Sequence, residues 1–212
     1  MSATFSRRQM LGAAAVGGAG LLLPAAALAA APAGPSAVLM ARAKAALERH
    51  PGAFARDLMA VVDFDAASSA ARFHLVNLTD GRTDSLLVAH GRGSDPDHSG
   101  WVERFSNAPG SAASSAGAYR SGSLYVGKHG PSRRIAGLDP TNSNAESRAI
   151  VVHGAWYVSP AMVRDHGKLG RSEGCFAVEQ SQLPMVLARL GEGRLIYADR
   201  TCARARRRTR VR

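Results

Sequence analysis

His153 and Cys175 are the residues of this chain whose types and spacing best suit nucleophilic catalysis. A free thiol, with a pKa near ~8.5, is only a few per cent thiolate at neutral pH, so it needs a neighbouring base or a cluster of backbone donors. An imidazole can be that base, and catalytic Cys and His residues are usually distant in sequence and close in the fold. Cys175 follows His153 by 22 residues. We therefore predict that Cys175 is a nucleophile and that His153 is its base.

The residues before each side chain indicate how it is held. An apolar run, residues 149–152, leads into His153-Gly154 and predicts a buried strand whose end is a rigid mount for a base. Cys175 follows Gly174, and glycine allows a tight turn that places the thiol beside free backbone N–H groups. We expect the strand end and the turn to meet in the folded chain.

The same residue types allow other roles. Cys175 can be a structural thiol, or can pair with Cys202 in an oxidising compartment, although Cys202 lies in an arginine-rich tail. Without the cysteine, His153 would be interpreted as a hydrogen-bonded core histidine. Two cysteines are too few for a disulfide framework and have no metal-ligand spacing, so we expect no metal and no cofactor.

The rest of the pattern predicts a mainly β domain with short helices around a mixed or antiparallel sheet. Residues 38–49 have helical apolar spacing, and Thr79-Asp80-Gly81 is a turn signal within a hairpin over residues 71–90. Residues 91–117 form a long polar loop, a feature that is usually functional in a compact domain. The predicted strands are residues 58–64, 72–78, 85–90, 119–129, 149–153 and 194–198, and the further helices are residues 159–166 and 181–190.

Both ends of the chain differ in composition from this domain. Arg7-Arg8, an apolar run and Ala27-Leu28-Ala29 predict a removable twin-arginine-type signal peptide over residues 1–29. The run is shorter than the ~20 residues that span a bilayer, and an uncleaved anchor is the alternative. We expect a protein of the periplasm or cell wall, with no transmembrane segment after signal removal. The remaining chain divides into a linker (30–36), the catalytic domain (37–199) and a basic disordered tail (200–212).

The formal net charge of +11 comes mainly from the two ends. Arg7 and Arg8 lie in the signal segment and seven arginines lie in the last thirteen residues, which leaves a near-neutral body. Nucleic-acid binding needs a basic folded face, so we expect no nucleic-acid partner. The tail is expected to be solvated, with contact to an anionic wall polymer or lipid as the alternative. The sequence leaves the oligomeric state open.

His153-Gly154, a spacer and Ser172-x-Gly174-Cys175 together resemble the signature of YkuD-type L,D-transpeptidases. The match is closest to the sub-branch described as murein L,D-transpeptidase catalytic domain proteins. The similarity runs over residues 61–198, nearly the whole mature domain. Several ordered stretches outside the core motif also fit it: residues 88–91 (VAHG), 104–107 (RFSN), 125–130 (YVGKHG) and 167–172 (GKLGRS).

Two departures separate this chain from the better-studied members. Those proteins have His where this chain has Glu173, and an Arg or Asn soon after the cysteine, where this chain has Phe176-Ala177-Val178. The spacer after His153 is also slightly longer. The catalytic pair survives these changes, but details of the substrate groove do not carry over.

The resemblance implies a peptidoglycan L,D-transpeptidase that acts on stem peptides. Cys175 would attack the carbonyl of the third, diamino-acid residue of a tetrapeptide, and D-alanine would leave with a proton from His153. An amine of a second stem peptide would then attack the Cys175 thioester and form a 3–3 cross-link. The Gly154 carbonyl would orient the imidazole, and N–H groups around Gly174 and Cys175 would hold the oxyanion.

Five further residues are candidates for the substrate groove or its support. Arg171 and Lys128 would contact substrate carboxylates, or would be solvated surface residues. His129, like His90, would line the groove or simply occupy a turn. Ser172 would shape the turn or donate a hydrogen bond.

Three other functions compete with the transpeptidase. If water replaces the amine, the same site is an L,D-carboxypeptidase. A catalytically silent wall-binding protein would keep the groove, although it would not need His153 and Cys175. A Cys-His protease of another fold is disfavoured by the ordered flanking motifs.

Overall fold

The computed structural model describes residues 34–202 of the chain. The predicted signal peptide, most of the predicted linker and residues 203–212 of the predicted tail lie outside the described residues. Arg200–Cys202, which the sequence analysis assigned to the tail, are held by hydrogen bonds. The Thr201 N–H and hydroxyl both donate to an Asp65 carboxylate oxygen at 2.6 Å, and the Cys202 N–H donates to the same carboxylate.

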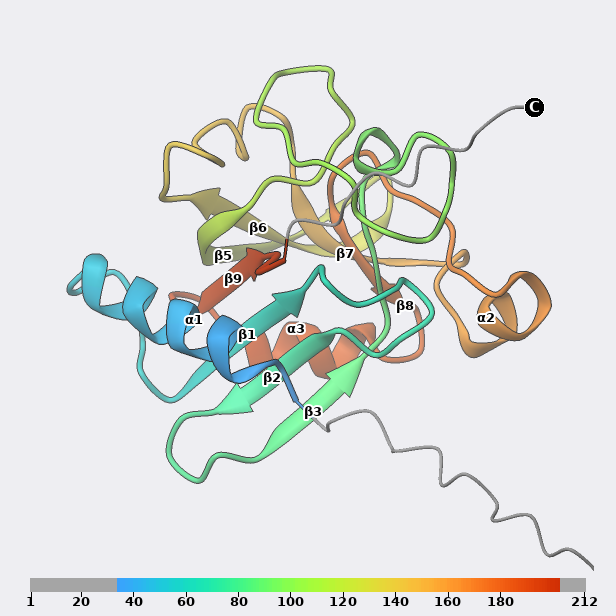
Figure 1. Cartoon of the computed structure of the whole chain (residues 1–212). Coiled ribbons are helices and arrows are strands. Elements are labelled where there is room, and N and C mark those ends of the chain that lie inside the picture. The colour runs from blue at the N-terminus through green and yellow to red at the C-terminus, as the bar shows by residue number, and fades with distance from the viewer. Residues whose placement is uncertain (1–33, 203–212) are drawn as a thin grey trace, which may run out of the picture. The chain divides into compact units, whose positions relative to one another are not determined.

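A mixed sheet of nine strands forms the body of the described chain (Figure 1). The strand order is β3-β2-β1-β9-β5-β6-β7-β8-β4. The pairs β1/β9 and β7/β8 are parallel, and every other neighbouring pair is antiparallel. The bounds are β1 (Leu58–Asp63), β2 (Phe73–Asn77), β3 (Thr83–Leu86), β4 (Val88–Ala89), β5 (Gly117–Gly127), β6 (Gly130–Gly137), β7 (Val151–Ala155), β8 (Phe176–Glu179) and β9 (Leu195–Asp199).

The two edge strands of this sheet, β3 and β4, are separated along the chain by Leu87 alone. Two strands joined by one residue cannot be far apart, so the sheet curls until its edges meet at Leu87. The buried Arg72 side chain supports this junction, because its Nε and Nη2 atoms donate to the Val88 carbonyl at 3.1 and 3.0 Å.

Three α-helices accompany the sheet in the described residues, as the sequence pattern predicts: α1 (Ala37–Arg49), α2 (Pro160–His166) and α3 (Leu183–Leu190). Ser36 and Ser159 cap α1 and α2, because each hydroxyl accepts a hydrogen bond from a first-turn N–H at 3.2 Å. A 3₁₀ turn, η1 (Arg92–Ser94), interrupts the predicted long loop.

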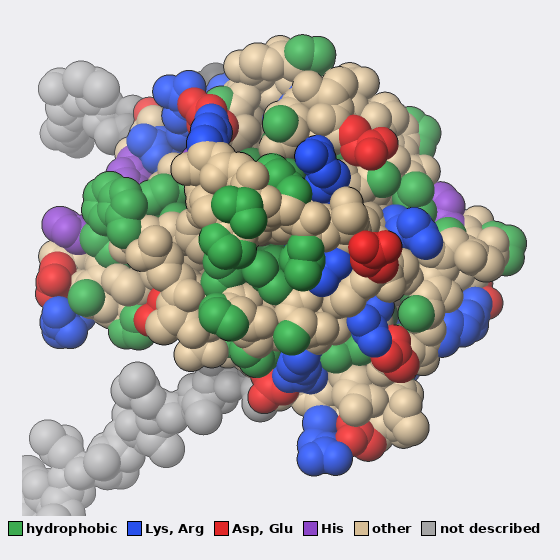
Figure 2. Space-filling view, turned by 180° about the vertical axis from the view of Figure 1, so that it is seen from behind, with side chains coloured by type: hydrophobic (Ala, Val, Ile, Leu, Met, Phe, Trp, Pro, Cys, Tyr) green, Lys and Arg blue, Asp and Glu red, His purple; other side chains and the backbone are tan. Residues whose placement is uncertain are grey.

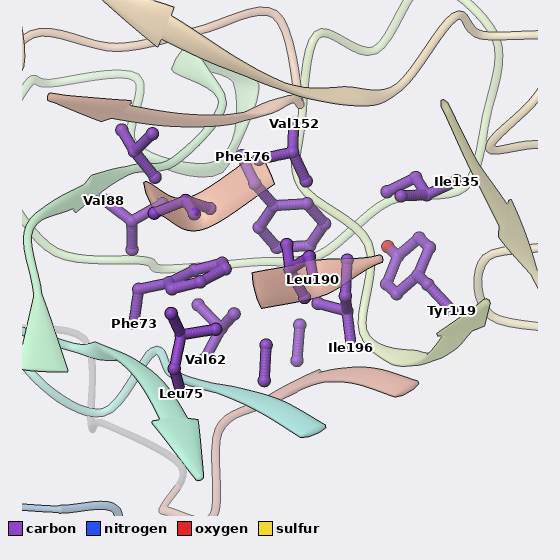
Figure 3. Packing of buried hydrophobic residues seen from close by; sticks show 14 of the residues in the cluster. Val62, Phe73, Leu75, Val88, Tyr119, Ile135, Val152, Phe176, Leu190 and Ile196 are labelled. Carbon is purple, nitrogen blue, oxygen red and sulfur yellow. The ribbon is translucent and has the colours of Figure 1, made fainter. Parts of the chain in front are cut away.

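The core lies on the two faces of the curled sheet. The inner face packs against α3 and includes Phe73, Val152, Phe176 and Ile196 (Figure 3). The outer face of β1 and β9 is covered by α1, which buries Leu39, Ala43, Ala46 and Leu47 (Figure 1). Burial of such side chains stabilises a fold by roughly 1.5–3 kcal/mol each. A third cluster, which includes Ala89, Ala155, Val158, Leu169 and Ala177, lies beside α2.

Polar and apolar side chains are distributed unevenly over the surface. Figure 2, the view from behind, shows apolar side chains gathered near the middle of that face with charged side chains around them. Among the described residues, the large apolar side chains that are most exposed are Val38, Leu124, Val126 and Trp156. No helix in the described part of the chain is long and apolar enough to cross a membrane.

The sequence prediction of the strands is correct in part. The predicted strand over residues 85–90 is divided, because its first residues pair with β2 while β4 pairs with β8. The strands β6 and β8 were not predicted, since β6 carries Gly, Pro and two arginines and β8 is only four residues long. The strand β7 begins at Val151, because Ala149 has a φ of +53°. His153 therefore lies in the middle of β7 and not at its end.

Candidate active site

The parallel pairing of β7 with β8 sets the strand that carries His153 beside the segment that follows Cys175. Val152 is in register with Phe176, and both side chains belong to the inner core. Because side chains alternate along a strand, His153 lies on the opposite face of β7 from Val152. Cys175 immediately precedes β8, two residues before Ala177, the residue that pairs with His153. The register thus brings the segments that carry the two residues side by side, and the contact between the side chains of His153 and Cys175 remains a prediction.

The His153 imidazole is buried and fixed in one tautomer. Its Nδ1 lies 2.9 Å from the Gly154 carbonyl oxygen, which can only accept, so Nδ1 carries the proton and Nε2 has a free lone pair. Burial lowers the pKa of His153; the bond to Gly154 opposes this, and the charges of His129 and Lys128 add to the lowering. At neutral pH the imidazole is therefore uncharged and able to accept a proton at Nε2.

The His129 ring covers the His153 ring. Their centroids are 4.2 Å apart and their planes are inclined by 16°. His129 and Lys128 form the two-residue tip of the β5–β6 hairpin, closed by Gly130 at a φ of +76°. Pairing of Ser132 with His153 in the β6/β7 ladder fixes this tip above β7. His129 is thus both a turn residue and a wall of the site.

The Cys175 thiol is 8 % exposed and points at a backbone oxygen. Its Sγ lies 3.6 Å from the Ala149 carbonyl, to which the S–H donates. Burial raises the pKa of the Cys175 thiol, and Glu173 raises it further; the Val151 N–H, Lys128 and Arg148 lower it. The thiol is therefore protonated in the resting structure. Both Cys175 and Cys202 are free, so they are not paired in this structure.

The turn that carries the thiol is held by Ser172. The Ser172 hydroxyl donates to the Cys175 carbonyl at 2.7 Å and accepts from the Gly174 N–H at 3.1 Å. Gly174 has a φ of +115°, and a Cβ there would lie 2.7 Å from the Ala113 carbonyl oxygen. Ser172 therefore shapes the turn, and the Gly174 N–H is engaged inside it.

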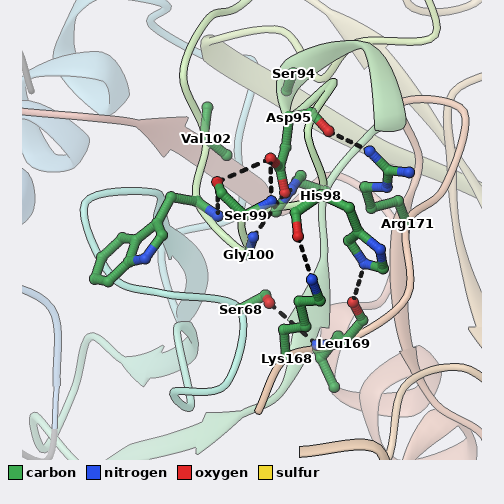
Figure 4. A network of polar contacts seen from close by, with 12 residues as sticks. Ser68, Ser94, Asp95, His98, Ser99, Gly100, Val102, Lys168, Leu169 and Arg171 are labelled. Atoms are coloured by element: carbon green, nitrogen blue, oxygen red, sulfur yellow. Dashed lines mark hydrogen bonds and ion pairs between the residues drawn. The ribbon is translucent and has the colours of Figure 1, made fainter. Parts of the chain in front are cut away.

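A buried polar network of Arg72, His90 and Asp95 supports this turn. Arg72 Nη2 lies 2.7 Å from His90 Nδ1, and His90 Nε2 lies 3.2 Å from Asp95 Oδ2. Asp95 also accepts from the N–H groups of Ser99 and Gly100 (Figure 4). Burial would raise the pKa of Asp95, but these donors hold it well below its usual range. The His90 carbonyl then accepts from the Ser172 N–H at 2.9 Å, which ties the network to the nucleophile turn.

Arg171 belongs to the same supporting structure. Its guanidinium donates to the main-chain carbonyls of Asp95 and Pro96, so it fastens the 91–117 loop (Figure 4). Neither of the two cavities beside His153 is lined by Arg171. Asp95 and Arg72 were not predicted, because without tertiary contacts a buried aspartate or arginine is not distinguishable from a surface one.

Two adjoining cavities open beside His129 and Gly154, and the first is also lined by His153. The first has a volume of about 350 Å³, and the second, of about 450 Å³, is more apolar. His129, Gly154 and Gln180 line both; Gln180 was not predicted, since an isolated glutamine carries no motif. The first is also lined by Lys128, His153, Ala155, Trp156 and Tyr157, and the second by Gly130, Pro131, Leu183, Pro184 and Leu187.

The described residues contain no group of three or more His, Cys, Asp or Glu side chains that could hold a metal ion. The first cavity is lined by the uncharged imidazole of His153 and by the cation Lys128, and the buried thiol of Cys175 lies on the segment that leads into β8. This set can carry out proton transfer and nucleophilic attack on a carbonyl.

Solved structures with a related fold are L,D-transpeptidases. One from Mycobacterium smegmatis is 14 % identical over 68 % of this chain and 58 % of its own, with a TM-score of 0.40. One from Mycobacterium tuberculosis H37Rv is 16 % identical over 68 % and 57 %, with a TM-score of 0.38. One from Xylanimonas cellulosilytica is 15 % identical over 74 % and 68 %, with a TM-score of 0.38.

The matched region of this chain spans about 58–59 % of the length of the first two L,D-transpeptidase structures it resembles. No curated protein matches the sequence. The family model of the L,D-transpeptidase catalytic domain matches residues 36–198, which include β1 to β8, all but the last residue of β9 and the three α-helices of the described residues. The chain therefore belongs to the L,D-transpeptidase catalytic domain family.

Proposed function

We propose that this protein is an exported peptidoglycan L,D-transpeptidase that works through a thioester on Cys175. The observation that supports the proposal is the β7/β8 register, in which His153 pairs with Ala177 and the neighbouring strand begins directly after Cys175. The bond between His153 Nδ1 and the Gly154 carbonyl adds the orientation that a general base needs. A binding module would have no use for a fixed imidazole tautomer and a buried thiol.

The first half of the reaction transfers an acyl group to Cys175. His153 Nε2 takes the thiol proton as Sγ attacks the carbonyl of the diamino-acid residue of a stem tetrapeptide. The tetrahedral intermediate collapses, the C–N bond to the terminal D-alanine breaks, and His153 returns the proton to the leaving amine. A neutral imidazole and a protonated thiol are the starting states that this sequence of transfers requires.

The second half transfers the acyl group to an amine. The amine of a second stem peptide attacks the thioester and loses a proton to His153 Nε2. The C–S bond breaks, Sγ recovers that proton, and a 3–3 cross-linked dimer leaves the site. If water attacks instead, the product is a tripeptide and the enzyme is an L,D-carboxypeptidase.

The oxyanion is assigned to the backbone N–H of Cys175. The Gly174 N–H donates to the Ser172 hydroxyl and is not free to turn toward a substrate oxygen. Loss of one oxyanion donor typically costs ~10²–10³ in rate, so the geometry of this turn has a large effect on activity.

Lys128 is the candidate for recognition of a substrate carboxylate. It lies at the hairpin tip and lines the first cavity beside His153. Arg171, the other cation that the sequence suggested, is engaged with the loop carbonyls. We therefore assign to Lys128 the carboxylate of the departing D-alanine.

The twin-arginine-type pattern in residues 1–29 supports export to the periplasm or cell wall, where this substrate is found. The arginine-rich end of the chain is proposed to be a solvated tail.

The proposal is tested by mass spectrometry of purified protein incubated with disaccharide-tetrapeptide. Wild type and Cys202→Ser, whose substitution is remote in sequence and on the surface, should both yield a cross-linked dimer, and Cys175→Ala should yield none. A tripeptide without dimer would change the assignment to carboxypeptidase. Absence of any product from wild type would favour a silent wall-binding protein.

A further inference from the structure

Arg148 is a half-buried cation with no carboxylate partner in the described part of the chain. Its guanidinium donates to the Ser106 carbonyl at 2.9 Å and to the Ser115 hydroxyl at 2.7 Å. It also donates to the Ala113 carbonyl and the Ser111 hydroxyl. All four acceptors are neutral. A buried charge is costly unless an opposite charge compensates it, so this guanidinium lacks a counter-ion in the resting structure.

The guanidinium lies against the turn that carries the nucleophile. A Cβ built on Gly174 would be 3.1 Å from Arg148 Nη2, so the absence of a side chain at Gly174 is what allows this approach. On its other side Arg148 precedes Ala149, whose carbonyl accepts the Cys175 S–H at 3.6 Å. Arg148 is therefore linked to Cys175 in two ways. Its guanidinium approaches Gly174, the residue before Cys175. Its main chain leads into Ala149, whose carbonyl accepts the hydrogen bond of the thiol.

The other titratable groups around Cys175 are differently placed. Lys128, on the β5–β6 tip, and Glu173, in the nucleophile turn, are exposed, and Glu173 is paired with Arg92 at 3.1 Å. Solvent and salt screen such charges strongly. His153 on β7 is uncharged at rest, and Tyr157, which follows β7, has a pKa raised to about 12 and stays neutral. Arg148 is the half-buried cation of this set.

We propose that Arg148 is a positioning residue that stabilises the thiolate of Cys175, and that the thiolate is the counter-ion which the guanidinium lacks at rest. The inference rests on the proposed role of Cys175 as nucleophile. It is consistent with the reciprocal electrostatics: burial lowers the pKa of Arg148 while the charges of Tyr119 and Cys175 raise it, and Arg148 lowers the pKa of the thiol. Arg148 thus opposes the rise in the pKa of Cys175 that burial causes.

The test is a pH titration of the thiolate by its ultraviolet absorbance, taken as the difference between each protein and its Cys175→Ala counterpart. The variants are Arg148→Gln, which removes the charge, and Arg148→Lys, which keeps the charge and loses the fork of donors. We expect Arg148→Gln to reduce the thiolate fraction at pH 7 roughly three- to tenfold, and Arg148→Lys to restore most of it.

The matched control is Arg133→Gln. Arg133 is a buried arginine that also donates to backbone carbonyls, those of Gly122 and Leu187, away from the nucleophile turn. The Arg133→Gln variant should leave the titration of the Cys175 thiol unchanged. An unchanged titration in Arg148→Gln, equal changes in Arg148→Gln and Arg148→Lys, or an equal change in Arg133→Gln would overturn the inference.

The measurement does not depend on turnover. If wild type made no product but the thiol titrations behaved as expected, the proposed function would fail and the electrostatic role of Arg148 would stand. If wild type made dimer and the thiol of Arg148→Gln titrated as in wild type, the proposed function would stand and the electrostatic role of Arg148 would fail.

Discussion

The imidazole of His129 lies parallel to that of His153, with ring centroids 4.2 Å apart. The two rings come from the tip of the β5–β6 hairpin and from the middle of β7, which are distant in sequence. The outer ring shields the inner one from water, and its charge, when present, opposes protonation of the inner one. Both effects keep His153 in the form that accepts a proton.

This stacking predicts a shift in the acid limb of the pH profile. In wild type, kcat/KM should fall at a pH below ~6.5, the ordinary imidazole value, because the pKa of His153 is lowered and the base is lost only when the pH passes that lowered pKa. His129→Ala should move the limb to higher pH, since it removes both the cover and the charge. His129→Phe, which restores a ring without charge, should lie between them. If the acid limb fell at the same pH in all three proteins, the proposed effect of His129 on His153 would be contradicted.

The geometry of the nucleophile turn predicts that Gly174→Ala will damage both stability and activity. At a φ of +115° and with the Ala113 oxygen 2.7 Å from the new Cβ, the turn must move. We expect a loss of about 1–3 kcal/mol in the free energy of unfolding and roughly 10²-fold in kcat/KM. Gly167→Ala is the control, because Gly167 has a φ of +69° but open space around its Cβ position. Denaturant unfolding measures the effect on stability, and steady-state kinetics measure the effect on activity. Equal activity losses in both variants would contradict the role assigned to the turn at Gly174.

The position of Lys128 predicts a defect in substrate binding. Lys128→Met should raise KM for the tetrapeptide about tenfold, because a charge-assisted hydrogen bond contributes ~1.5–3 kcal/mol, while kcat should change little. Arg164→Met removes an exposed cation on α2, paired with Asp165, and should leave both constants unchanged. A loss confined to kcat would show that Lys128 does not bind the ground-state carboxylate.

The buried His74 predicts a pH dependence of stability that is separate from the active site. Burial lowers the pKa of His74 to about 4, while its unfolded value is near ~6.5. As the pH falls through this interval, the unfolded chain takes up a proton and the folded chain does not. The contribution of uncharged His74 to the free energy of unfolding is thus fully present above pH ~6.5. It is lost as the pH falls toward 4, by about 3 kcal/mol at most.

Urea unfolding at several pH values tests this prediction in wild type and His74→Gln. The glutamine can still hydrogen-bond to the Ser85 hydroxyl, which lies 2.8 Å from His74 Nδ1. Stability should fall less steeply in the variant between pH 6.5 and 4. The same slope in both proteins would mean that other groups, such as His90, dominate the acid response.

The residue types and short motifs were sufficient to predict several parts of this protein. Turn signals and helix caps are local, and for this reason the β2–β3 hairpin and the three helices were predicted from the sequence. The spacing of His153 and Cys175, with glycine before the thiol, predicts that their side chains meet, and the β7/β8 pairing of the segments around them is consistent with it. The ordered motifs identified the family, which the family model over residues 36–198 confirms.

Only the tertiary structure decided which contacts surround that pair. The strands β3 and β4 lie at opposite edges of the order and meet because the sheet curls, which no local pattern records. The stacking of His129 on His153, the engagement of Arg171 with the loop and the approach of Arg148 to Gly174 each join segments distant in sequence. Periodicity and turn chemistry report on neighbours along the chain, whereas these contacts depend on strand register and on how the loops pack.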